Sequence, residues 1–239
     1  MNLFSRFAQP AQFIRLARWL IPVLALGSAL AFAFGLYFAL FASPPDYQQG
    51  ETVRIMYVHV PAAWIGMGLY SAMAVAAALG LVTRRALADI FCVAAAPVGA
   101  VFVALCLVTG SLWGRPTWGA WWVWDARLTS VLIMFFLYCG VIALRHSFDD
   151  DERGGKASAI LLLVGAVNIP IVKFSVDWWH TLHQPASLLR AKGVAIAPEM
   201  LRPLLMMGAA YALYAAWLIV LRMQTVLQTR AIDSAREEA

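Results

Sequence analysis

The stretch of sequence that decides the fold runs from Ile90 to Asp125 and reads IFCVAAAPVGAVFVALCLVTGSLWGRPTWGAWWVWD. Its first part, residues 90–112, carries no charged side chain and is long enough to cross the ~30 Å hydrocarbon layer, which takes about 20 residues as a helix. Its second part, residues 113–125, contains five of the ten tryptophans of the chain. The stretch therefore predicts a membrane-spanning helix followed by an aromatic segment at the membrane surface.

The chain as a whole has the same apolar character. The full sequence has 239 residues, of which 62% are hydrophobic and 13% are charged, and its mean hydropathy is +0.74. We expect one all-α integral membrane domain, residues 1–239, built as a six-helix bundle. The expected spans are about 19–41, 62–82, 90–112, 128–144, 159–176 and 201–221.

The positions of the basic residues predict the orientation. Eleven of the 18 Lys and Arg residues flank one set of span ends, and six flank the other. Because cytoplasmic loops carry the excess of positive charge, we expect both termini in the cytoplasm. Segments 42–61, 113–127 and 177–200 then lie outside, and the net charge of +5 reflects topology and contact with anionic lipid, not nucleic-acid binding.

Two of the outer segments each carry a histidine that could bind a metal. His59 lies in MYVHVPAAW, just before Pro61, which we expect to start the second span, and His183 lies in DWWHTLHQP after the fifth span. Two neutral imidazoles on either side of an aromatic plate can ligate haem iron axially. The residues therefore predict a haem site with His59 and His183 as ligands. Its aromatic surface would comprise Trp113, Trp118, Trp121, Trp122 and Trp124.

Haem propionates require cations near the water boundary. The candidates are Arg54, Arg115, Arg127, Arg190 and Lys192. Asp125 ends the aromatic segment, where it could face the site or cap the fourth span. Arg127 could equally be a flank that sets topology.

Other interpretations remain open at this level. The tryptophans could form an interfacial re-entrant loop, and His180 lies three residues before His183, so either could be the iron ligand or both could bind a divalent metal. A membrane cytochrome would place its histidines on facing helices, whereas these lie in predicted loops. A structural transporter subunit without a haem site is the other alternative. We find no nucleophile or general acid that indicates an enzyme, and no phosphate-binding loop.

The segment WGRPTWGAWWVWDARLTS, residues 113–130, resembles the tryptophan-rich signature of the haem-handling membrane proteins of cytochrome c biogenesis. Six spans, the chain length and a histidine in each flanking outer segment resemble one family within that group. This is the cytochrome c maturation protein C family, also called haem exporter protein C. The stretches PPDYQQG at 44–50, YVHVPAAW at 57–64 and VDWWHTLHQP at 176–185 extend the likeness along most of the chain.

The resemblance implies a function in the bacterial inner membrane. The family presents haem b at the periplasmic face to a periplasmic haem chaperone. It works beside the ATPase and membrane subunits of an ABC-type complex and a small single-span helper. In that scheme His59 and His183 correspond to the axial ligands, and the tryptophan segment holds the haem edge. Haem could cross the bilayer through this chain or be collected outside it. Because the spans offer no polar path, we favour collection.

Overall fold

The computed structural model describes residues 10–184, 193 and 195–237, and these residues are almost entirely helical. Their only β pairing is an isolated bridge between Asp46 and Gly50. The α-helices are α2 (Pro10–Tyr37), α3 (Met56–Thr83), α4 (Ala86–Trp118), α5 (Ala126–His146), α6 (Asp151–Gly165), α7 (Asn168–Trp178) and α8 (Pro198–Glu237). A π-helical turn, η1 (Phe38–Ala42), extends α2, and a 3-10 helix, η2 (Glu51–Ile55), leads into α3.

Six helical stretches of the described chain are long and apolar enough to cross a membrane, as predicted. They are Pro10–Ala42, Glu51–Thr83, Ala86–Trp118, Ala126–His146, Asp151–Trp178 and Pro198–Arg236. Each expected span lies inside one of them. The prediction of an all-α, multi-pass membrane bundle is therefore confirmed.

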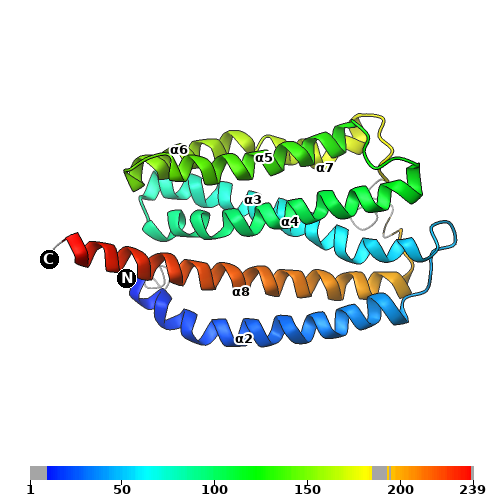
Figure 1. Ribbon diagram of the computed structural model, residues 1–239, viewed down its shortest axis with the longest axis horizontal. Coiled ribbons are helices and arrows are strands. Elements are labelled where there is room, and N and C mark those ends of the chain that lie inside the picture. Colours follow the sequence, from blue (N-terminus) through cyan, green and yellow to red (C-terminus); the bar gives the residue numbers. More distant parts are fainter. Residues whose placement is uncertain (1–9, 185–192, 194, 238–239) are drawn as a thin grey trace.

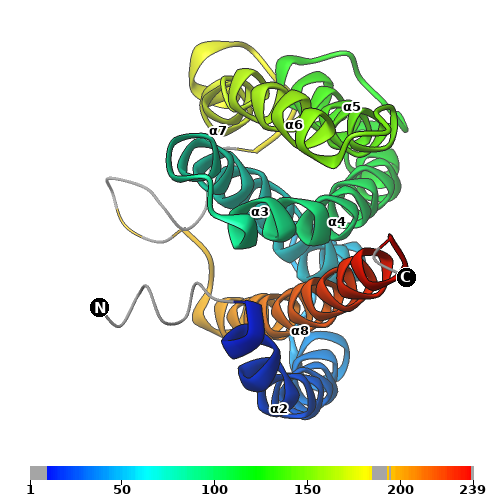
Figure 2. The ribbon, with the colours of Figure 1, turned by 90° about the vertical axis from the view of Figure 1, so that its left-hand side faces the viewer.

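The helices pack in three layers with α4 at the centre (Figures 1 and 2). One layer is α2 against α8, the middle layer is α3 against α4, and the third contains α5, α6 and α7. In the most apolar window of α4, 61% of the residues are buried, the largest share among the six stretches. A buried hydrogen bond of 2.8 Å, from the Tyr138 hydroxyl to the Gly66 carbonyl, ties α5 to α3. The central position of α4 makes it the element from which the candidate site is built.

The two ends of the bundle carry different connections between the helices. The connections α2–α3, α4–α5 and α7–α8 gather at one end, which we call the loop end (Figure 1). Helix α2 begins and α8 ends at the opposite end, which we call the terminus end, together with the α3–α4 and α5–α6 turns. The described parts of the three segments predicted to share one side of the membrane therefore lie at the same end.

The expectation that His59 lies in a loop is wrong. Helix α3 begins at Met56, so His59 is a helical residue, and Pro61 lies inside the helix instead of starting it. The 3-10 turn of η2 already places the chain in a helical path before the proline. Proline removes one N–H, which would have bonded to the Tyr57 carbonyl, and the helix continues past this loss.

The tryptophan segment and the fifth span also differ from expectation. Helix α4 continues through Trp118, and Gly119, with φ of 78°, ends it by donating its N–H to the Arg115 carbonyl. Within the segment 113–127, only residues 119–125 are therefore non-helical. The fifth span breaks into α6 and α7, because Pro170 has no N–H to donate to the Ala166 carbonyl.

Candidate haem site

The structure brings His59 and His183 together at the loop end. Their ring centroids lie 6.4 Å apart and their planes make an angle of 35°. His59 lies on α3, and His183 lies in the irregular segment that follows α7. Of the two candidate histidines after the fifth span, His180 is exposed and His183 is the one that lies beside His59.

The ring of His59 is held from its Nδ1 side by α4. Nδ1 lies 3.0 Å from the Cys106 carbonyl oxygen and 3.2 Å from Thr109 Oγ1. A carbonyl can only accept, so Nδ1 carries the hydrogen and the neutral ring keeps its lone pair on Nε2. Gly110 makes this approach possible, because a Cβ there would lie 3.0 Å from His59 Cε1.

His183 is held in the same way. Its Nδ1 donates to the Gln184 carbonyl at 2.9 Å, and its backbone N–H donates to Thr181 Oγ1 at 3.1 Å. Burial lowers the pKa of His183, and the Arg127 charge lowers it further, whereas the Gln184 carbonyl and the Asp125 carboxylate act in the opposite direction. The result favours the neutral imidazole, which is the form that binds metals.

The separation of the two rings fits two ligands of one metal ion. Histidines that bind metals usually donate the other ring N–H to a carbonyl or carboxylate, which fixes the tautomer and the ring direction. A metal that binds two histidine nitrogens at about 2.0 Å on opposite sides holds the ring centroids about 6 Å apart. The observed 6.4 Å agrees with this separation. Within the described residues, no group of three or more His, Cys, Asp or Glu side chains could hold a metal ion.

Two of the five predicted tryptophans contact the histidines. Trp113 meets His59 edge-on with centroids 5.7 Å apart, and Trp118 lies 6.2 Å from His183. Both belong to the last turns of α4, so the helix extension places them beside the imidazoles. These four rings form the aromatic part of the candidate site.

The other three tryptophans lie in the connection that follows α4. Trp122 packs edge-on against Trp124 at 5.4 Å, and its indole N–H is buried without a hydrogen-bond partner in the described structure. Trp121 and Trp124 are 56% and 76% exposed. They therefore offer apolar surface to the lipid interface or to a partner.

A further residue of the site, Gln49, was missed by sequence reasoning. Its side-chain oxygen accepts the indole N–H of Trp113 at 2.8 Å. Asp46 Oδ1 accepts the N–H groups of Gln48 and Gln49, and Gly50 takes φ of 56° to close the turn. An Asp followed four residues later by Gly is a turn signal, and it could have located this loop.

Asp125 acts as the N-cap of α5, one of the two roles considered for it. Its Oδ1 accepts the Leu128 N–H at 2.7 Å. Its Oδ2 is buried and has no hydrogen-bond partner in the described structure. The carboxylate therefore keeps one acceptor free close to His183, on whose charge it acts.

The cations predicted to bind the propionates have different partners in the structure. Arg127 donates to Ser175 Oγ at 2.7 Å and lies near enough to His183 to affect its charge. Arg54 bonds to Glu51 and to the Ala39 carbonyl. Arg115 donates to the Gly119 carbonyl at 2.6 Å, and Arg190 and Lys192 fall outside the described residues. Arg127 is the candidate best placed to act at the histidine pair.

Comparisons with known proteins identify the family of the chain. The model of the family described as "Heme exporter protein C" matches residues 3–238. "Heme exporter protein C" of Bradyrhizobium diazoefficiens is 49% identical over 227 residues, covering 95% of this chain and 86% of the relative. The Escherichia coli K12 protein of that name is 46% identical over 222 residues, 93% and 89% of the two chains. The one from Paracoccus denitrificans is 36% identical over 234 residues, 97% of each chain. The chain therefore belongs to the heme exporter protein C family.

Proposed function

We propose that this membrane protein serves haem export for cytochrome c biogenesis by holding haem b at its loop end between His59 and His183. Its family name supports a haem transport component more than an enzyme. One observation carries the proposal. The ring centroids of two imidazoles from distant parts of the chain lie 6.4 Å apart, and each ring is fixed through Nδ1 so that Nε2 remains available.

The residues around the pair have separate tasks in this proposal. The indoles of Trp113 and Trp118 supply flat apolar surface against which a porphyrin buries area. Arg127 is the cation for a propionate, although its bond to Ser175 must rearrange to serve it. The Asp125 Oδ2 atom is an acceptor, and the Trp122 indole N–H is a donor, without a hydrogen-bond partner in the described structure.

The two ligands differ in how firmly the protein holds them, and this difference suits delivery. His59 lies on α3 and contacts two acceptors of α4. His183 lies outside any helix, and its side chain bonds only to a neighbouring residue in the described structure. Displacing His183 therefore disturbs less structure. Its departure would open one axial position of the iron to a ligand from the acceptor protein.

The proposed acceptor is a periplasmic haem chaperone, with the loop end facing the periplasm of the bacterial inner membrane. The charge bias of the span ends supports this orientation. The exposed Trp121 and Trp124, in the connection that follows α4, form the proposed docking surface. ATPase and membrane subunits of an ABC-type complex and a single-span helper would assemble beside this chain. Haem would be collected from the outer side, because the spans contain few ionisable groups.

Haem titration of the purified full-length protein tests the assignment of the ligands. His59→Ala and His183→Ala are each expected to lower haem affinity, and the double variant is expected to lose the haem absorbance bands. His146→Ala and His180→Ala are matched controls, since both histidines are exposed and lie outside the pair. Size-exclusion profiles and circular dichroism report folding of every variant. Unchanged spectra in a folded double variant would refute the proposal.

A further inference from the structure

The terminus end contains a cavity of about 950 Å³ among α3, α4, α5, α6 and α8, at the opposite end of the bundle from the histidine pair. Its inner wall is apolar and includes Ala77, Cys92, Val141 and Leu162. Its rim is charged. Six cations, Arg84, Arg85, Arg145, Lys156, Arg222 and Arg230, line it together with three carboxylates, Asp89, Asp151 and Glu152.

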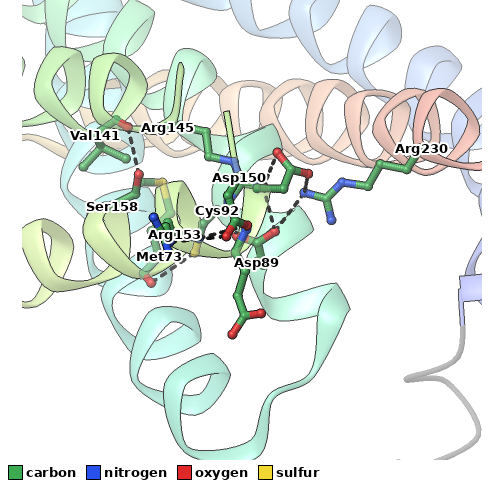
Figure 3. A network of polar contacts seen from close by, with 11 residues as sticks. Met73, Asp89, Cys92, Val141, Arg145, Asp150, Arg153, Ser158 and Arg230 are labelled. Carbon is green, nitrogen blue, oxygen red and sulfur yellow. Dashed lines mark hydrogen bonds and ion pairs between the residues drawn. The ribbon is translucent and has the colours of Figure 1, made fainter. Parts of the chain in front are cut away.

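The carboxylates are already paired with half of these cations. Arg145 from α5 and Arg230 from α8 each form an ion pair of 2.9 Å with Asp89 of α4 (Figure 3). The same two arginines reach Asp151 at 3.3 and 3.2 Å. Lys156 pairs with Glu152 at 2.6 Å. The other three cations form no direct ion pair with a carboxylate among the described residues, although the charge of Arg84 acts on Glu152 from a distance.

These three charges belong to Arg84, Arg85 and Arg222. Arg222 donates to the neutral Ala94 carbonyl at 3.0 Å, which leaves its charge uncompensated. The side chains of Arg84 and Arg85 form no hydrogen bond or ion pair with the described residues. Arg84 also adopts φ of 52°, a left-handed helix end where glycine is the usual residue and a side chain costs about 1–2 kcal/mol. An anionic ligand would account for a cation at this unfavourable position.

A second pocket, an apolar groove, adjoins the charged cavity. This groove of about 450 Å³ lies between α2, α4 and α8 and shares two lining residues, Pro97 and Arg222, with the charged cavity. Between Pro97 and Leu105 it follows α4 for about 12 Å, at 1.5 Å per residue. Arg222 is its single charged lining residue among those described. An elongated apolar groove that adjoins a cationic cavity fits a hydrocarbon chain joined to an anionic group.

We propose that this is a binding site for an anionic phospholipid. Its anionic headgroup would lie in the cationic cavity that Arg84, Arg85 and Arg222 line, and one acyl chain would lie in the groove beside Val101 and Leu105. Basic cavities between transmembrane helices bind anionic lipid headgroups elsewhere by the same charge attraction. Haem is also an amphipathic anion, but its compact plate does not match a groove that runs along a helix. The proposal does not depend on the haem site at the loop end.

The test compares lipids bound to the detergent-purified, delipidated full-length protein by native mass spectrometry. Phosphatidylglycerol is expected to bind, and phosphatidylcholine is expected to bind much more weakly. The variant Arg84→Gly with Arg85→Gln removes two charges and relieves the left-handed strain at residue 84, so it should fold normally. We expect about 30-fold weaker phosphatidylglycerol binding in this variant. Val101→Trp, which fills the groove, is expected to weaken binding without changing the charge.

Arg153→Gln with Arg236→Gln is the matched control, because both arginines are exposed at the same end and lie outside the cavity lining. This control should bind phosphatidylglycerol as the parent does. The proposal would be overturned if the two lipids bound equally well. It would also be overturned if the control variant lost as much phosphatidylglycerol binding as the Arg84 and Arg85 variant. Haem binding that the Arg84 and Arg85 changes abolish while phosphatidylglycerol binding persists would also overturn it. A negative result in the lipid test would not contradict the proposed haem site, because haem titration tests the histidine pair separately.

Discussion

His59 and His183 face each other at 6.4 Å although one lies on a transmembrane helix and the other follows a different helix far along the chain. Helix α4 connects them, because Trp113 contacts the first ring and Trp118 contacts the second. The candidate site therefore depends on the last turns of α4. Changes in those turns should affect haem binding before they affect the fold.

Gly110 gives the most direct steric test of this dependence. A valine there should push the His59 ring from its position, because a Cβ would already lie 3.0 Å from Cε1. We expect haem affinity to fall about tenfold, the size of a modest overpacking strain. Gly68→Val on α3 is the control, since a Cβ there meets nothing within 4 Å. Haem titration by absorbance measures both variants, and equal affinities would contradict the placement of His59.

Thr109 tests the hydrogen bonds that orient His59. Thr109→Val removes one of the two acceptors of Nδ1 and leaves the Cys106 carbonyl. Loss of a group that hydrogen-bonds to a metal ligand lowers metal affinity about 10–100-fold. We expect haem affinity to fall about tenfold, because one acceptor of Nδ1 remains. Thr109→Ser keeps the hydroxyl and should bind haem like the parent protein. A serine variant as weak as the valine variant would show that the hydroxyl is not responsible.

The bond between Gln49 and Trp113 should couple the α2–α3 loop to the aromatic site. Gln49→Leu leaves the indole N–H unpaired, and we expect about 1 kcal/mol of lost stability. In a Trp113→Phe background the same change should cost almost nothing, because the donor is already absent. Thermal unfolding of the four proteins of this cycle in detergent measures the coupling. Additive effects would show that the two side chains do not interact.

Asp89 should matter for stability and not for haem. Asp89→Asn removes the shared partner of Arg145 and Arg230, which join α5 and α8 to α4. Because Asp89 is partly exposed, we expect a loss of about 1–2 kcal/mol, below the 3–5 kcal/mol typical of a fully buried pair. Asp233→Asn, at an exposed pair of 3.9 Å, should change little. A weaker haem affinity in Asp89→Asn would contradict the separation of the two ends.

Topology fusions test the orientation. A fluorescent protein fused after Ala239 should be fluorescent, and alkaline phosphatase fused there should be inactive, because the C-terminus is proposed to lie in the cytoplasm. A phosphatase inserted after Gly119, in the α4–α5 connection, should instead be active. The reverse pattern would place the histidine pair on the cytoplasmic side and remove the basis for delivery to a periplasmic chaperone.

Apolar run length was sufficient to predict the fold. Each predicted span lies inside an observed helical stretch, because hydropathy marks the part of a helix that meets lipid. Hydropathy does not mark helix ends, where polar residues continue the helix. For this reason hydropathy alone predicts loops at His59 and Trp118, although both residues are helical.

The candidate site was predictable as a set of residue types but not as a set of contacts. Histidines and clustered tryptophans are unusual enough to be noticed in an apolar chain. The orientation of His59 comes instead from a backbone carbonyl at Cys106, and a carbonyl leaves no trace in sequence. Similarly, Gln49 reaches Trp113 only because the α2–α3 turn folds back on α4.

Electron paramagnetic resonance of the ferric haem-loaded protein tests the central claim most directly. We expect a low-spin signal with two nitrogen axial ligands in the parent protein. In His183→Gly we expect a high-spin signal that returns to low spin when imidazole is added. A low-spin signal that persists in folded His183→Gly without imidazole would contradict the claim that His59 and His183 together hold the iron.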